Sequence, residues 1–223
     1  MTVFDVVRAL PGISAVRDRS RSMAMLDAIL SPEWQYRYFS FDSRWAPGQE
    51  MASMRDGSGN DYSIVFTPAG AWARGFDHES PVSPLRVAPP ALWPGLIDSV
   101  PAVFGTQVAE PAFADSDGRI LRATVCFWRE AADAEWHCGQ VDVRVPGRED
   151  ADSADWLFEV LVEGNAEAYR DFAEEYFETD VDLAAVRHVY DLAPLTREVV
   201  AALNSDLELV DLAEDVAEIG YPL

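Results

Sequence analysis

The sequence predicts an α+β fold: an antiparallel sheet of roughly six strands flanked by N-terminal helices and an acidic C-terminal helical region. Three observations favour this class. Apolar residues recur at helical spacing in residues 1–32 and again in residues 155–219. Short apolar runs separated by turn residues fill residues 33–145, and two hairpin signals connect some of these runs. We expect one α+β domain over residues 1–223.

Residues 1–32 are predicted to form two helices that are separated at Pro11-Gly12. The apolar residues before this pair fall on one helical face, and those that follow it form a second stripe that stops at Pro32. A short basic run lies between the two stripes, and we interpret it as a solvated face. Its members are Arg17, Arg19 and Arg21.

The centre of the sheet is predicted from two turns. Residues 56–60 read Asp-Gly-Ser-Gly-Asn, which is typical of a turn because glycine accepts positive φ and Asp and Asn tolerate it. Residues 50–55 and 61–66 are then the two arms of a hairpin. A second turn at Pro68-Ala69-Gly70 returns residues 71–76 as a third strand.

A strongly aromatic segment, residues 34–45, precedes this meander, and we expect it to be the first strand of the sheet. Aromatic side chains can stack on bases or sugars, but they also dominate protein interiors, so we assign these rings to the core. The rings concerned are those of Trp34, Tyr36, Tyr38, Phe39 and Phe41.

A second hairpin is predicted from residues 119–129 and 135–145, after an irregular insert rich in Pro and Gly at residues 81–118. If this hairpin is symmetric about Ala132, Trp128 faces Trp136, and Cys126 faces Cys138 in the same way. A slip of one residue would exchange the two faces of each strand, so the register stays open. Both cysteines are interpreted as buried thiols.

The net charge of −22 is concentrated in the C-terminal third of the chain. Residues 149–223 hold 21 acidic residues and 3 arginines, whereas residues 1–148 hold 18 acidic residues and 14 arginines. Direct binding to nucleic acid or to an anionic membrane needs a basic patch, so we expect neither. An acidic field would steer a basic partner toward the protein, although acidic helices can also serve solubility alone.

The composition is that of a soluble globular protein. No stretch approaches the roughly 20 consecutive apolar residues that a membrane-spanning helix needs. The N-terminal residues do not resemble a signal peptide, and two cysteines do not make a secreted disulfide scaffold. We therefore expect a cytoplasmic protein, and the sequence leaves its oligomeric state open.

The densest cluster of ionisable groups follows the third predicted strand, where the chain reads Asp77-His78-Glu79-Ser80. A histidine beside carboxylates can act as a general base, and loops at strand ends often carry binding groups. Neighbours in an extended chain point to opposite faces, however, so the two carboxylates can orient the His78 ring only if the chain turns there. A role in loop structure is the simpler alternative.

Metal and cofactor sites are not predicted. The candidate zinc ligands, which lack the spacing of known zinc sites, are His78, His137, Cys126 and Cys138. The turn at residues 56–60 begins like a calcium-binding loop, but Asp61 stands where such a loop needs Gly and Thr67 where it needs Glu. We expect no bound cofactor.

Several short motifs between residues 38 and 95 resemble those of an uncharacterised bacterial protein family of similar length. These motifs are Phe41-x-x-x-Trp45, Glu50-Met51-Ala52-Ser53-Met54, Gly57-Ser58-Gly59, Gly75-Phe76-Asp77-His78-Glu79-Ser80 and Trp93-Pro94-Gly95. The resemblance implies no activity and no ligand. In its general character, a compact acidic α+β protein also resembles bacterial toxin-immunity proteins, although no motif carries that likeness.

Two functions follow as hypotheses. The first is a non-enzymatic binding module whose acidic C-terminal helices bind a basic protein, with an immunity-like role as one form of it. The alternative is an enzyme or small-ligand receptor with a site around Asp77, His78 and Glu79, together with Ser80. In that version Arg55 or Arg74 would hold an anionic group of the ligand.

Overall fold

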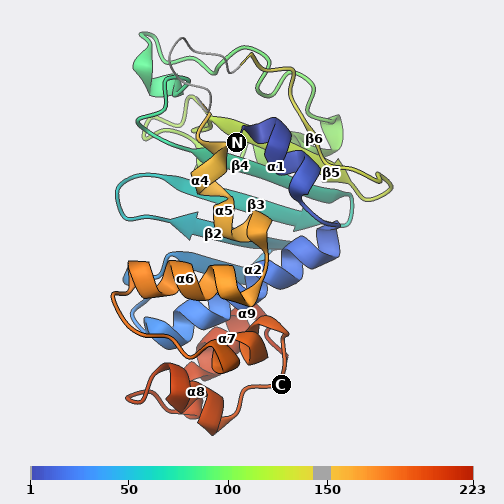
Figure 1. The fold of residues 1–223 in the computed structure, drawn as a ribbon. Coiled ribbons are helices and arrows are strands. Elements are labelled where there is room, and N and C mark those ends of the chain that lie inside the picture. Colours follow the sequence, from blue (N-terminus) through green and yellow to red (C-terminus); the bar gives the residue numbers. More distant parts are fainter. Residues whose placement is uncertain (1, 143–151, 223) are drawn as a thin grey trace. The chain divides into compact units, whose positions relative to one another are not determined.

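The computed structural model describes residues 2–142 and 152–222 and has an α+β fold (Figure 1). Within these residues it contains nine α-helices and a six-stranded antiparallel sheet in the order β1-β2-β3-β4-β5-β6, so the predicted fold class is confirmed. The helices are α1 (Val3–Ala9), α2 (Ile13–Leu30), α3 (Gly105–Val108), α4 (Ala154–Leu157), α5 (Glu159–Glu163), α6 (Ala166–Tyr176), α7 (Leu183–Tyr190), α8 (Arg197–Leu203) and α9 (Ala213–Ile219). The strands are β1 (Phe39–Ala46), β2 (Gln49–Arg55), β3 (Asp61–Thr67), β4 (Gly70–Phe76), β5 (Val125–Glu130) and β6 (His137–Cys138).

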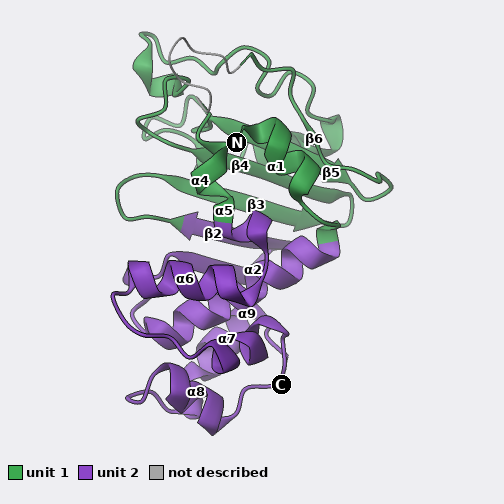
Figure 2. Ribbon diagram, in the orientation of Figure 1, with its two compact units in different colours: residues 1–13, 55–159 green, residues 14–54, 160–223 purple. Residues whose placement is uncertain are grey.

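The chain divides into two compact units, which Figure 2 shows in different colours. Unit 1 comprises residues 1–13 and 55–159, and unit 2 comprises residues 14–54 and 160–223. Each unit therefore combines segments that lie far apart in the sequence. That residues 1–223 form one domain stays a prediction.

The two N-terminal helices form as the sequence predicts. The first begins after Thr2, whose backbone N–H and hydroxyl both donate to the carboxylate of Asp5, and it ends at Ala9, just before Pro11. The basic run of α2 does more than face solvent. Arg17 and Arg21 both form ion pairs with Glu50 in unit 2, and Arg19 donates to the backbone carbonyl of Leu161 over 3.0 Å; these contacts hold α2 within its unit.

The three strands predicted from the two turns are β2, β3 and β4, and their bounds differ from the prediction by one residue at most. In unit 1, β3 and β4 pair along their whole length, with Val65 opposite Trp72. On its other side β4 pairs with β5, where Trp72 lies opposite Trp128. A fully buried indole thus occupies the centre of this part of the sheet.

The second hairpin, formed by β5 and β6, pairs with the one-residue slip that the sequence left open. Trp128 pairs with His137 and Phe127 with Cys138, so the predicted pairs Trp128–Trp136 and Cys126–Cys138 are wrong by one residue. The cause is the turn, which closes between Glu130 and Asp133 through the backbone bond from Asp133 N–H to the Glu130 carbonyl. The second predicted strand shortens to the two residues of β6, and residues 143–145 lie outside the described part of the chain.

The core of unit 1 closes where α4 meets the sheet. The ring of Phe158, the residue after α4, stacks on Tyr62 with ring centroids 4.8 Å apart and meets Phe127 edge-on at 5.0 Å. Gly75 in β4 makes this packing possible, because a Cβ atom there would lie 3.0 Å from Phe158 and 3.1 Å from Leu157.

The core of unit 2 forms around α2, β1 and α6. Strand β1 begins at Phe39, five residues later than predicted, because residues Trp34–Tyr36 form a short 3₁₀ helix, η1. The rings of Phe39 and Phe172 lie 5.2 Å apart, and Tyr169 of α6 is fully buried beside them. The C-terminal residues are helical as predicted, with α6 capped by Asn165 and α8 by Thr196.

Candidate functional site

The Asp77-His78-Glu79-Ser80 segment forms a turn at the end of β4 in unit 1. Asp77 is buried and its carboxylate accepts two hydrogen bonds, one from the Ser153 hydroxyl over 2.6 Å and one from the Glu79 backbone N–H over 2.8 Å. The Asp77 N–H in turn donates to Thr124. These bonds occupy both carboxylate oxygens of Asp77 with the protein's own donors.

The remaining side chains of this turn point in different directions. His78 is exposed, and both its backbone N–H and its ring Nδ1 contact the side-chain oxygen of Asn60, at 3.0 and 2.7 Å. This ties the segment to the turn at residues 56–60. Glu79 is exposed, whereas Ser80 is buried and its Oγ accepts the Val82 N–H over 3.2 Å. The four residues are adjacent, but their functional groups do not converge.

The two arginines proposed for an anionic ligand belong to strands β2 and β4 and not to the turn itself. Arg74 is buried and forms an ion pair with Asp61, which also accepts a bond from Arg122 over 3.2 Å. Burial lowers the pKa of Arg74 from its usual value, and the charge of Asp61 opposes that effect. The Arg74 guanidinium also lies over the ring of Phe113 at 5.1 Å. Arg55 is half-buried at the end of β2.

Among the residues that the structure describes, no three His, Cys, Asp or Glu side chains gather as a metal site would require. Cys126 is buried and Cys138 is half-buried, and both are free thiols. Burial raises the pKa of Cys126 to about 12 and that of Cys138 to about 11, so both thiols stay protonated near neutral pH.

No helix within the described ranges is long and apolar enough to cross a membrane.

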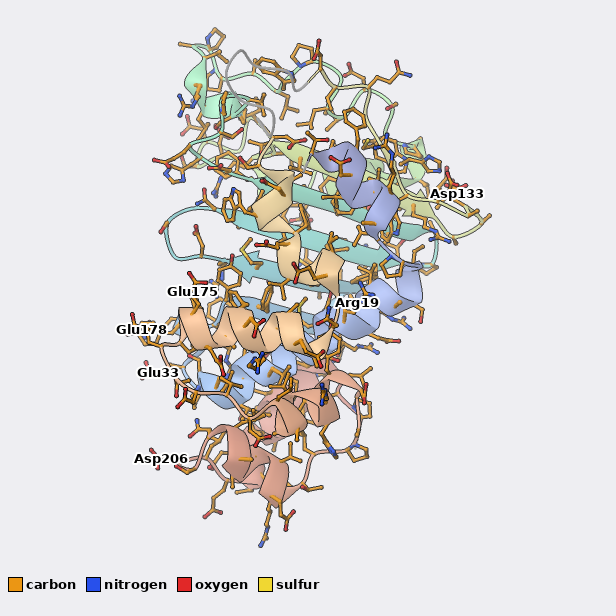
Figure 3. The ribbon with its side chains drawn as sticks, viewed as in Figure 1. Arg19, Glu33, Asp133, Glu175, Glu178 and Asp206 are labelled. Carbon is orange, nitrogen blue, oxygen red and sulfur yellow. The ribbon has the colours of Figure 1, made fainter. Side chains whose placement is uncertain are left out.

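The C-terminal helices of unit 2 and the loops between them carry a large set of exposed carboxylates. Twelve of them form no ion pair within the described part of the chain: Glu163, Glu175, Glu178, Asp180, Asp182, Asp191, Glu198, Asp206, Glu208, Asp211, Glu214 and Glu218. Figure 3 shows Glu33, Glu175, Glu178 and Asp206 projecting from the same side of unit 2. The acidic composition therefore becomes an acidic surface.

Glu218 of α9 lies among charges of both signs. Partial burial raises its pKa above the usual value, and the charges of Asp42 and Asp215 raise it further, whereas those of Arg37 and Arg44 oppose the shift. Asp215 is itself paired with Arg37 at 2.5 Å, a contact that joins α9 to the segment before β1. A cationic group brought to this surface would relieve the repulsion between the carboxylates.

Exposed aromatic side chains lie on the same unit as these acids. Trp34 and Tyr36, which follow Glu33, are 53% and 60% exposed, and Tyr176, which follows Glu175, is 37% exposed. Contacts between rings link the two segments, because Tyr38 lies 4.9 Å from Tyr176 between ring centroids. We call the set Glu33, Trp34, Tyr36, Glu175, Tyr176 and Glu178 the aromatic–acidic patch.

The assignment of all five early aromatics to the core is thus wrong for Trp34 and Tyr36, which are exposed, and right for Phe39 and Phe41, which are buried, while Tyr38 is half-buried. The sequence does indicate that these two rings could be exposed. In Pro32-Glu33-Trp34-Gln35-Tyr36-Arg37 the aromatic residues alternate with charged or polar residues directly after a proline. This pattern fits a surface segment with aromatic contacts as well as it fits a strand.

No protein-family model, no curated protein and no solved structure matches this chain. The resemblance of its motifs to a bacterial family therefore stays an expectation.

Proposed function

We propose that this protein is a non-enzymatic cytoplasmic binding module that holds a basic protein partner on the acidic surface of unit 2. The observation that carries the proposal is the aromatic–acidic patch, in which exposed rings stand beside carboxylates that have no ion pair among the described residues. Carboxylates attract Lys and Arg side chains over a distance, and the faces of Trp and Tyr bind the same cations at short range.

The patch has the composition of a protein-binding surface. Aromatic residues are enriched at interfaces, and Trp and Tyr dominate the residues that contribute most to affinity. Acidic side chains around them would determine which partners approach and how fast they associate. If the basic partner is an enzyme whose own active surface is positively charged, binding there would block it, which is the immunity-like form of this function.

The alternative, a catalytic or ligand-binding site around Asp77, His78 and Glu79, receives less support from the geometry. Both oxygens of Asp77 already accept hydrogen bonds from Ser153 and Glu79, and the His78 ring contacts Asn60. A general base needs its acceptor atom within reach of a substrate proton. These groups are used instead to hold the turn.

The test is a pull-down from the native host's lysate at low salt, followed by elution with rising salt. We expect one basic protein, released as salt screens the carboxylates over the Debye length of about 8 to 10 Å. The Glu175→Gln/Glu178→Gln variant should weaken capture severalfold by removing two charges from the patch.

The matched control is Asp117→Asn/Glu135→Gln, which removes two charges from exposed positions of unit 1. It should leave capture unchanged. A partner that is held equally by both double variants, or that is not released by salt, would contradict the proposal.

A further inference from the structure

Two hollows lie side by side in the C-terminal part of unit 2. The first has a volume of about 550 Å³ and a mostly apolar lining that includes Leu195, Leu209, Val216, Ala217 and Tyr221. The second has a volume of about 500 Å³, and its lining includes Leu207, Leu209 and Val210. Leu209 lines both hollows, so they are neighbours, and we call the pair the C-terminal groove.

The groove exposes apolar surface that the fold itself does not use. Val210, in the short 3₁₀ helix η5 (Leu209–Leu212), is 71% exposed, the largest fraction among the exposed large apolar side chains of the described residues. The hydroxyl of Tyr221 is held by the carbonyls of Ala193, at 2.7 Å, and Val189, at 3.1 Å. Because its hydroxyl is already hydrogen-bonded, Tyr221 lines the first hollow with its ring. Each hollow has the volume typical of ligand-binding pockets.

The segment that lines this groove is acidic. Residues 191–222 contain eight acidic residues and a single base, Arg197, which lines the second hollow beside Glu208. Arg44, from β1, donates to the carbonyl of Ala217 in the lining of the first hollow. Asp191 is close enough to Tyr221 to add to the raised pKa of that phenol, which is due first to burial. The pKa of Glu218 on α9 is also raised. The first hollow is mostly apolar and the second is lined by apolar and polar groups alike. We call this lining the floor of the groove and the carboxylates of residues 191–222 its acidic rim.

This charge pattern determines which kind of molecule can bind in the C-terminal groove. A fatty acid or a phospholipid would bring an anionic head to the acidic rim, and a second copy of this chain would bring the same carboxylates, so both would be repelled. A segment that is apolar on one side and basic on the other satisfies the floor and the rim together. Helices that bind in grooves place apolar side chains at positions i, i+3, i+4 and i+7.

We infer that the C-terminal groove binds a basic amphipathic helix of the partner, whose apolar side chains enter the two hollows while its Lys and Arg side chains meet the acidic rim. This inference rests on the proposed function and adds to it the chemistry of the segment that is recognised. The aromatic–acidic patch and the groove would then be two parts of one acidic binding surface on unit 2.

Two synthetic peptides of the same Leu and Lys composition provide the test. In one the leucines follow the i, i+3, i+4, i+7 spacing, and in the other they are distributed evenly around the helix. Binding to the full-length chain is followed by fluorescence anisotropy at low salt. We expect the amphipathic peptide to bind at least about tenfold more tightly, which corresponds to 1.4 kcal/mol.

Variants then locate the site. Ala217→Trp places an indole in the first hollow and should reduce the affinity for the amphipathic peptide to that of the scrambled one. Ala202→Trp, at an exposed position of α8 that neither hollow includes, is the matched control and should bind as the wild type does. Val210→Ser changes an exposed side chain without disturbing the core and should weaken binding severalfold, so the inference stays testable if Ala217→Trp does not fold.

The outcomes separate the two proposals. Equal binding of both peptides, unaffected by Ala217→Trp and Val210→Ser but weakened by salt, overturns the groove and leaves the acidic surface. Preferential binding that is lost in Ala217→Trp but indifferent to salt also overturns the inference, because salt would screen Lys and Arg side chains that meet the acidic rim. Absence of binding by both peptides overturns the groove, and failure of the lysate pull-down is then needed to overturn the proposed function as well.

Discussion

The hydroxyl of Tyr169 lies 2.6 Å from a carboxylate oxygen of Asp27, and both side chains are completely buried in unit 2. The other oxygen of Asp27 accepts the backbone N–H groups of Tyr38 and Phe39, each over 2.8 Å. One carboxylate thus joins α2 to α6 and to the start of β1. These segments form the core beneath the aromatic–acidic patch.

Replacing Asp27 should destabilise unit 2 strongly. Asp27→Ala leaves one hydroxyl and two backbone N–H groups buried without an acceptor, and we expect the free energy of unfolding to fall by about 3 kcal/mol or more. Tyr169→Phe removes one bond to the carboxylate and should cost about 1.5 to 3 kcal/mol. Urea unfolding followed by circular dichroism measures both. Asp18→Ala, at a half-buried position of the same helix, is the control and should cost less than about 1 kcal/mol.

Asp27 should also make stability depend on pH. Burial raises its pKa to about 7, although the hydrogen bonds from Tyr169, Phe39 and Tyr38 act in the opposite direction. In the unfolded chain an aspartate titrates near about 3.9. Between these values the folded protein keeps a proton that the unfolded chain has released, so the contribution of this group falls as the pH rises from about 4 to about 7.

The measurement compares wild type with Asp27→Asn by urea unfolding at several pH values. Subtracting the unfolding free energy of the variant from that of wild type at each pH removes the effect of every other titrating group that the two proteins share. We expect the difference in unfolding free energy, wild type minus variant, to decrease steadily across that range. A difference that stays constant or increases with pH would show that the carboxylate is ionised throughout.

The turn that follows β4 should behave as a structural element. Ser153→Ala removes the donor to the buried carboxylate of Asp77, and we expect the free energy of unfolding to fall by about 1.5 to 3 kcal/mol. His78→Ala changes an exposed side chain and should cost no more than about 0.5 kcal/mol. Guanidinium unfolding of the two variants checks this contrast. A thermal shift produced by a small ligand in wild type but not in His78→Ala would instead favour a binding site there.

Gly75 should tolerate no larger residue. In Gly75→Ala the new Cβ atom would lie 3.0 Å from the ring of Phe158 and 3.1 Å from Leu157, so we expect a loss of about 1 to 3 kcal/mol from overpacking. Gly105→Ala is the matched substitution at the start of α3, where no atom lies within 4 Å of the new carbon. That variant should be neutral or stabilised by up to about 1 kcal/mol. Thermal unfolding of the pair tests this packing.

Local signals in the sequence predict much of the fold. Strands β2, β3 and β4 follow from the turn at residues 56–60 and from Pro68-Ala69-Gly70, because turn chemistry is encoded in adjacent residues. The β5–β6 register differs from the prediction by one residue because it depends on where Asp133 closes its turn, and β6 has only two residues to set it. Such details are decided by tertiary contacts.

The candidate site could be predicted only in part. The charge of residues 149–223 indicated an acidic surface, but it did not show that Trp34 and Tyr36 would be exposed on the same unit as Glu175 and Glu178. Asp27 did carry a local signal, since it is the one acid in the apolar sequence Met25-Leu26-Asp27-Ala28-Ile29. Its partner Tyr169 is 142 residues away and could not be identified from periodicity.

The composition of unit 2 from residues 14–54 and 160–223 has a consequence for synthesis of the chain. While the ribosome adds the intervening residues 55–159, α2 has already emerged, but Asp27 still lacks Tyr169 and the aromatic residues of β1 lack α6. Unit 2 can therefore be completed only after its C-terminal segment has left the ribosome. By this order a nascent chain would present neither the aromatic–acidic patch nor the C-terminal groove, so a partner that recognises them would bind only finished molecules.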